Sequence, residues 1–164
     1  MKKLTSLITL IMLVITFTVQ PAFANSNIES ITTEVFDDGS YFITVIEDSS
    51  TPLDLFKHDA AYPMATKTET KTKTTYYKNS NDETLWYVRV KGTFTYGNGT
   101  SKCTAVTPSA ASQNTYWKVS NISGSKSGNT ASATATGKYV VSGSVLNVKT
   151  KTVTLTCSST GVFS

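Results

Sequence analysis

The sequence has few of the residues on which enzymes and metal proteins most often rely. Its 164 residues include one histidine, two cysteines, four prolines and nine glycines. A zinc site needs three or four good ligands, so this content excludes a Cys/His zinc site. It also excludes a disulfide-dense miniprotein and a collagen-like repeat. Without a leader of 24 residues, 140 residues remain, which is the size of one domain.

Common catalytic and phosphate-binding motifs are missing as well. There is no Gly-x-Ser-x-Gly elbow, no P-loop and no dinucleotide fingerprint. His58 stands beside Asp59, but no pattern around this pair predicts the ordered scaffold that a catalytic base needs. All acidic residues precede residue 84, outside the predicted rigid frame that a glycosidase-like carboxylate pair requires. We therefore predict a protein that is not an enzyme and uses no cofactor or metal.

The first 24 residues have the three-part pattern of a secretory signal peptide. Two lysines precede an uncharged run over 4–19, Pro21 ends that run, and Ala22 and Ala24 are the small residues that a signal peptidase requires. We predict cleavage after Ala24 and a secreted, extracellular product without a stable membrane anchor. The alternative is an uncleaved anchor, but a spanning helix needs about 20 apolar residues and this run is shorter.

The two cysteines, Cys103 and Cys157, fit the same compartment. Each lies in a stretch of β-forming residues, and an even number of cysteines in a secreted protein favours one disulfide. Closing a loop of this length would stabilise the fold by about 4 kcal/mol in the chain-entropy model. Two inert buried thiols are the alternative. A redox role is not favoured, because no Cys-x-x-Cys spacing lowers either pKa.

Charge is divided along the chain. Residues 25–60 carry eight acids and one lysine, whereas residues 84–164 carry eight bases and no acid. Scattered lysines can simply keep sheet edges from aggregating. The long acid-free stretch instead favours a positive field that faces something anionic, either the N-terminal segment itself or an anionic cell-wall polymer. Nucleic acid is not expected as the partner of a secreted protein with a net charge of +4.

The N-terminal part of the mature chain is predicted to be separate from the main domain. Two β-rich runs flank Asp38-Gly39, a strong hairpin signal, so we predict an acidic N-terminal β-hairpin segment over 25–47. A hairpin alone is marginally stable, so this one either docks on the main domain or stays loosely ordered. Residues 48–69 lose all periodicity and are predicted as a linker.

Residues 70–164 are predicted to form a disulfide-bonded antiparallel β-sandwich. From Trp86 to Tyr96 apolar and polar side chains alternate, which indicates a strand with one buried face. Alternating alanines over 130–136 predict the close approach of an opposing sheet, and Trp86 and Trp117 are expected in the core. No helical stripe follows the leader, so the fold class is all-β. The strand count does not select a topology, and an immunoglobulin-like one is among those it allows.

Two strands carry more specific predictions. Residues 71–78 alternate lysine and threonine, which is typical of an edge strand. In residues 145–157 the apolar positions switch from even to odd numbers. A β-bulge between Lys149 and Thr152 would bring both halves onto one core.

Several motifs in this region resemble those of a known family. They are the stretch from Leu85-Trp86 to Tyr96, Cys103-Thr104, the run 126–136, Thr-Leu-Thr-Cys157-Ser158 and Gly161. Over about residues 70–164 the chain resembles a family of small secreted β-rich proteins of Gram-positive bacteria (Firmicutes), classed as a domain of unknown function. The resemblance implies secretion, a β fold and the bridge between the two cysteines. It implies no activity, ligand or catalytic residue.

Aromatic and basic side chains on one strand face are the functional candidate. Tyr87, Arg89 and Lys91 share the predicted outer face, where they could stack on sugar rings and neutralise anionic groups. An ordinary solvated sheet face is the alternative. We expect a secreted, non-enzymatic protein that binds anionic cell-envelope polymers or glycans. Two alternatives are a toxin or antimicrobial masked by its acidic segment 25–60, and a self-associating extracellular matrix protein.

Overall fold

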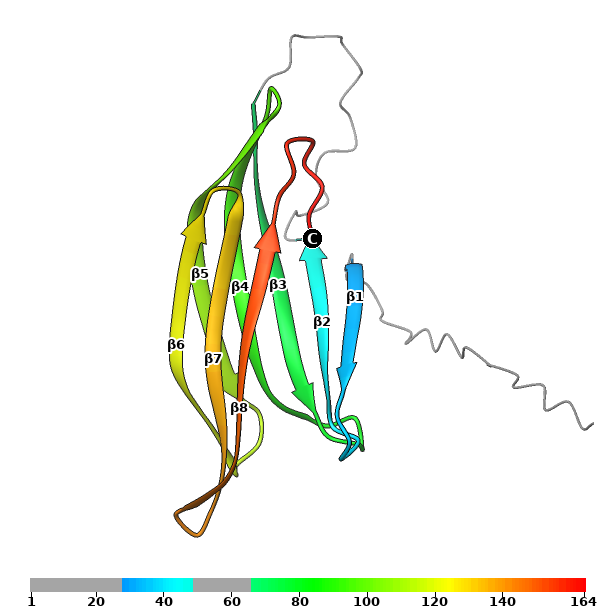
Figure 1. Ribbon diagram of the computed structural model, residues 1–164, viewed down its shortest axis with the longest axis vertical. Helices are drawn as coiled ribbons and strands as arrows, with labels where there is room; N and C mark the ends of the chain where they lie inside the picture. The colour runs from blue at the N-terminus through cyan, green and yellow to red at the C-terminus, as the bar shows by residue number, and fades with distance from the viewer. Residues whose placement is uncertain (1–27, 49–65) are drawn as a thin grey trace, which may run out of the picture.

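The computed structural model describes residues 28–48 and 66–164, and these residues form eight β-strands and no helix (Figure 1). The predicted all-β class is therefore confirmed for this part of the chain. The predicted signal peptide, with Ala22 and Ala24, lies outside the described residues, as does most of the predicted linker. The strands are β1 (Ile28–Val35), β2 (Tyr41–Asp48), β3 (Lys67–Lys78), β4 (Thr84–Gly97), β5 (Thr100–Ser112), β6 (Trp117–Ser127), β7 (Thr130–Val141) and β8 (Ser144–Thr156).

The strands form two antiparallel sheets in which consecutive strands are neighbours. One sheet has five strands in the order β1-β2-β3-β4-β5, and the other has three in the order β6-β7-β8. A short connection over 113–116 joins them, and β5 and β6 lie side by side in Figure 1. Both sheets are simple meanders, whereas an immunoglobulin-like fold needs Greek-key connections. The described residues therefore do not adopt an immunoglobulin-like topology.

β3 is an interior strand of the five-stranded sheet. It pairs with β2 on one side and with β4 on the other, so the prediction of an edge strand over 71–78 was wrong. Its threonines suit this position because their hydroxyls find partners within the sheet. The Thr75 and Thr44 hydroxyls are 2.8 Å apart, and the Arg89 Nε–H donates to the Thr74 hydroxyl over 2.9 Å. Pairing with both neighbours also makes β1 and β2 part of this sheet.

The core lies between the two sheets. The predicted alternation on β4 is confirmed, since Trp86, Val88 and Val90 are fully buried. The alanines of β7 are buried against this face, and both tryptophans belong to the core as predicted. Burial of these side chains is the main favourable contribution to folding.

Gly137 shows how closely the sheets approach. A Cβ at this position would lie 2.5 Å from the Trp86 ring, which is closer than two carbon atoms can pack. The absence of a side chain on β7 therefore makes room for the largest buried side chain of β4.

The predicted bulge between Lys149 and Thr152 was also wrong. The pairing of β8 with β7 is regular over this stretch, and the register shift occurs nearer the turn, between Tyr139 and Val140. The apolar positions switch because the two ends of β8 have different surroundings. Near the turn, Leu146 and Val148 are 64% and 50% exposed. Their exposure leaves an apolar surface at this end of β8.

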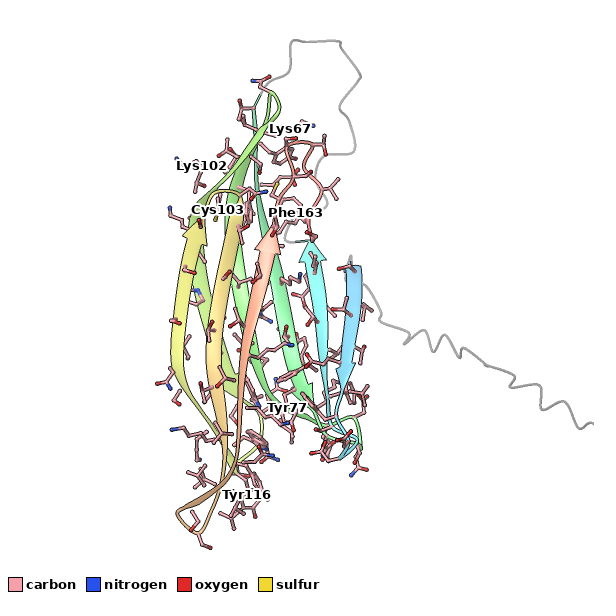
Figure 2. The ribbon with its side chains drawn as sticks, in the orientation of Figure 1. Lys67, Tyr77, Lys102, Cys103, Tyr116 and Phe163 are labelled. Atoms are coloured by element: carbon pink, nitrogen blue, oxygen red, sulfur yellow. The ribbon has the colours of Figure 1, made fainter. Side chains whose placement is uncertain are left out.

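Cys103 and Cys157 are free thiols in this structure, and both are buried. The Cys103 N–H donates to the Gly128 carbonyl over 2.8 Å, and the Cys157 N–H donates to the Asn129 carbonyl over 3.1 Å. Both backbones thus pair with the β6–β7 turn and not with each other. The structure therefore does not contain the expected bridge. Cys103 lies at the end of the molecule opposite Tyr116 (Figure 2).

Candidate functional site

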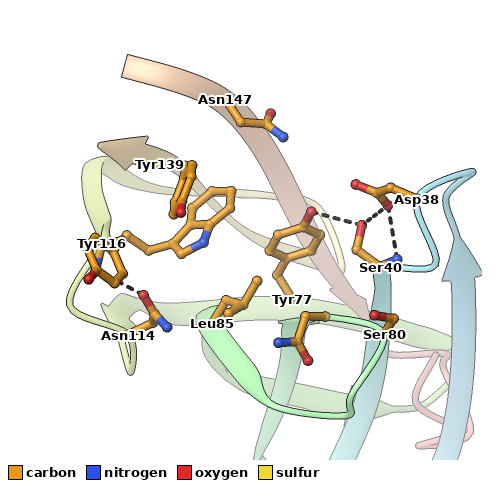
Figure 3. A pocket seen from close by; sticks show the side chains of 11 residues that line it. Asp38, Ser40, Tyr77, Ser80, Leu85, Asn114, Tyr116, Tyr139 and Asn147 are labelled. Carbon is orange, nitrogen blue, oxygen red and sulfur yellow. Dashed lines mark hydrogen bonds between the residues drawn. The ribbon is translucent and has the colours of Figure 1, made fainter. Parts of the chain in front are cut away.

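A pocket of about 330 Å³ lies at the end of the molecule where several turns meet (Figure 3). The β1–β2 and β3–β4 turns contribute to it, together with the β5–β6 connection and residues near the β7–β8 turn. Eleven residues line it, and most are aromatic or carry an amide, hydroxyl or carboxylate group. They are Asp38, Ser40, Tyr77, Asn79, Ser80, Leu85, Asn114, Tyr116, Trp117, Tyr139 and Asn147.

The aromatic side of the pocket is a series of rings in contact. The ring centres of Tyr77 and Trp117 are 5.2 Å apart, those of Trp117 and Tyr139 are 5.7 Å apart, and those of Tyr139 and Tyr116 are 6.1 Å apart. The series begins in the core, where Tyr77 is 2% exposed, and ends at Tyr116, which is 54% exposed. A buried cluster therefore holds in place the rings that reach solvent, at little cost in side-chain freedom.

The β1–β2 turn places a fixed carboxylate in the pocket lining. The Ser40 N–H donates to Asp38 Oδ1 over 3.0 Å, and the Ser40 hydroxyl donates to the same oxygen. The Tyr77 hydroxyl donates to Ser40 Oγ over 2.9 Å, which links the carboxylate to the aromatic series. The hydrogen bonds from Ser40 hold the pKa of Asp38 below its ordinary value, so the group is an ionised acceptor at neutral pH.

The amides of the pocket differ in how far they are already engaged. Asn79 Oδ1 accepts the N–H groups of Asn81 and Glu83, and Asn114 Oδ1 accepts the Tyr116 N–H over 2.9 Å. These two amides stabilise their own turns. The Asn147 amide makes no hydrogen bond within residues 28–48 and 66–164, so its donors and acceptor are available to a ligand.

The residues predicted from sequence lie elsewhere, on the outer face of β4. Tyr87, Arg89 and Lys91 alternate with buried residues, and Lys91 is exposed. The Arg89 guanidinium lies 5.2 Å from the centre of the Tyr87 ring, and the Tyr87 ring contacts Tyr76 with centres 6.0 Å apart. The structure brings the three residues together, but Tyr87 and Arg89 already bind each other and β3.

Sequence reasoning missed the pocket because its residues come from distant parts of the chain. Tyr116, Tyr139 and Asn147 are near strand ends, and only the sheet topology shows that those ends meet. The cluster of asparagines and tyrosines near predicted turns was the one signal that could have found it.

Two lysines of β8 lie against an acidic residue and two aromatic rings of the N-terminal β1–β2 hairpin. Lys151 forms an ion pair with Glu34 of β1, and its ammonium lies 4.6 Å from the centre of the Phe42 ring. Lys149 lies over Phe36 at 3.8 Å. One ion pair therefore links the acidic N-terminal strand to the basic C-terminal strand.

The described residues include no helix long and apolar enough to cross a membrane. Within the same residues no group of three or more His, Cys, Asp or Glu side chains could hold a metal ion.

Comparisons with known proteins give no relative for this chain. No family model matches it, no curated protein matches it, and no solved structure matches it.

Proposed function

We propose that the protein is a secreted, non-enzymatic β-sandwich module that binds a glycan in the pocket of Figure 3. The observation that carries this proposal is the convergence of a partly exposed aromatic series with an unengaged amide and a fixed carboxylate. Aromatic faces pack on the C–H faces of sugar rings, and amides and carboxylates bind their hydroxyl groups. A concave site in which a few placed polar groups fix the orientation of a ligand is the usual form of a binding site for a small ligand.

The charge at the pocket favours a neutral sugar. Asp38 is ionised at neutral pH and would repel an anionic group placed against it. An anionic polymer could still carry the sugar, with its acidic groups outside the pocket and near the basic surface. A bacterial cell envelope contains both kinds of polymer, and secretion through the predicted leader would bring the protein to it.

Calorimetric titration with neutral and anionic envelope glycan fragments tests this proposal. We expect a neutral fragment to bind, and Tyr116→Ala and Asn147→Ala to weaken binding about tenfold or more, because each removes a direct contact. Tyr87→Ala is the matched control on the outer face of β4 and should leave the affinity unchanged. Loss of affinity in Tyr87→Ala alone would move the site to that face. Equal affinity in all three variants would contradict both locations.

A masked toxin or antimicrobial is the second candidate, and one contact favours it. Glu34 pairs with Lys151, so the acidic strand β1 neutralises part of the basic strand β8. Residues 25–60 would then restrain the basic domain until removed. Killing of target cells by the exported protein is compared before and after limited proteolysis in this segment. An increase supports the mask, and equal inactivity before and after cleavage contradicts it.

The exported state is itself a proposal and has a direct test. The intact mass of the protein recovered from culture medium should correspond to residues 25–164, since cleavage is expected after Ala24. A mass that includes the leader, or recovery only from inside the cell, would contradict secretion.

A further inference from the structure

The turn between β7 and β8 is an apolar tip that projects from the molecule. Val145, Leu146 and Val148 are 52%, 64% and 50% exposed. The tip lies beyond the β1–β2 and β3–β4 turns, at the lower end of Figure 1. Large aliphatic side chains gathered at one exposed turn are rare in a surface that only meets water.

The backbone of the tip is built to hold these side chains in place. Ser142 and Gly143 both have positive φ, of 49° and 82°, as in the tight two-residue turn that matches the twist of a hairpin. The register shift next to Leu146 interrupts the alternation, so that adjacent residues of β8 are both exposed. The apolar tip is therefore a fixed feature of a well-paired hairpin.

Two lysines lie on the strands beside the tip. Lys138 of β7 lies opposite Val148 of β8 and also opposite Lys118 of β6, so the two lysines are cross-strand neighbours on one face. Residues 84–164, which include the whole tip, contain no acidic residue. Two acidic turns lie at this end of the molecule: Asp82 pairs with Lys78 over 2.8 Å, and Asp38, which lines the pocket together with Asn147, accepts the hydrogen bonds of Ser40.

We propose that the β7–β8 tip docks on an anionic lipid bilayer. Apolar side chains at a turn enter the boundary between headgroups and acyl chains, and the two lysines beside them neutralise anionic headgroups. Charge complementarity selects this surface over a second copy of the chain, because two such tips would bring like charges together. The proposal goes beyond glycan binding and does not depend on it. Asn147 faces the pocket from between the exposed residues of β8, so docking would hold the pocket near the membrane.

Binding of the exported protein to vesicles tests the proposal. Vesicles of phosphatidylcholine alone are compared with vesicles that also contain phosphatidylglycerol, at low and high salt. We expect binding to the anionic vesicles, weaker at high salt. The double variant Val145→Ser/Leu146→Ser should lower the partition coefficient about tenfold or more, since it removes the apolar contact. Lys118→Glu/Lys138→Glu should lower it about tenfold or more on anionic vesicles only.

Matched controls are available at the opposite end of the molecule. Val162 is 65% exposed and Lys102 is exposed, and both belong to the end that Figure 2 marks with Lys102 and Phe163. Val162→Ser and Lys102→Glu should bind vesicles as the unchanged protein does. All variants keep the same N-terminus, and thermal unfolding shows that each is folded. The proposal is overturned if neither kind of vesicle binds the protein, or if Val145→Ser/Leu146→Ser binds as well as Val162→Ser. It is equally overturned if sedimentation shows a dimer that the tip variant abolishes.

Discussion

Asp38 connects the chemistry of the pocket to the acid stability of the fold. Hydrogen bonds from Ser40 lower its pKa below the ordinary 3.8. A carboxylate whose folded-state pKa is depressed contributes stability that is present above the unfolded pKa and is lost as the pH falls through the folded pKa. The hydrogen bonds of Asp38 should therefore stabilise the protein at neutral pH and weaken in acid.

The variant Asp38→Asn tests this linkage. We expect its melting temperature to fall less steeply than that of the unchanged protein as the pH decreases below 3.8. Thermal unfolding followed by circular dichroism from neutral to acid pH provides the measurement. Asp37→Asn removes the adjacent carboxylate and is the control, because the hydrogen bonds of Ser40 go to Asp38. Identical profiles for Asp38→Asn and the unchanged protein would show that the Ser40 hydrogen bonds do not affect stability.

The two cysteines give a second prediction for single residues. Burial raises the pKa of both the Cys103 and the Cys157 thiols, so little thiolate is present in the folded state. We expect slow reaction with a thiol reagent in native buffer and two reactive thiols per chain in denaturant without a reductant. Failure to detect thiols in denaturant, with a mass two daltons low, would show that the bridge expected from the sequence forms after all.

Strand β7 controls the distance between the two sheets. A Cβ at Gly137 would lie 2.5 Å from the ring of Trp86, which is fully buried and cannot move aside. Gly137→Ala should therefore lower the free energy of unfolding by about 1–3 kcal/mol, the usual cost of overpacking a core. Denaturant unfolding measures the change. Ser132→Ala, on the opposite face of the same strand, should change stability by less than about 0.5 kcal/mol. Equal stability of Gly137→Ala and the unchanged protein would contradict the close packing of the sheets.

The elements were predictable where burial alone decides the pattern. The alternation on β4 and the alanine face of β7 indicated strands whose inner faces are fully covered, and both are buried as expected. The pattern of apolar and polar residues gave wrong predictions where contacts with neighbouring strands determine the surroundings of a side chain. β3 resembled an edge strand because hydroxyl partners on β2 and β4 are invisible in a single sequence. The sequence of β8 suggested a bulge because its apolar positions switch from even to odd numbers. They switch because Lys149 and Lys151, which lie over aromatic rings, occupy the positions that apolar residues would otherwise take.

At the scale of the whole molecule, the candidate site could not be predicted from the sequence. The sequence predicted an aromatic and basic surface. It placed this surface on β4, where the alternation of apolar and polar side chains was clear. The pocket instead depends on which strand ends meet, and this follows from the two meanders and the connection between them. The same arrangement brings Glu34 to Lys151 from opposite ends of the chain. The division of charge in the sequence had suggested such a contact without locating it.

The central claim is that the pocket lined by Trp117 binds a sugar, and the two tryptophans allow it to be tested directly. The chain contains only Trp86 and Trp117, so its nuclear magnetic resonance spectrum should show two indole N–H signals. Trp86 is fully buried and does not line the pocket, whereas Trp117 does. Titration with a neutral envelope sugar should shift the Trp117 signal in a saturable way and leave the Trp86 signal in place. An unchanged Trp117 signal at saturating sugar, with shifts on the outer face of β4, would contradict the account.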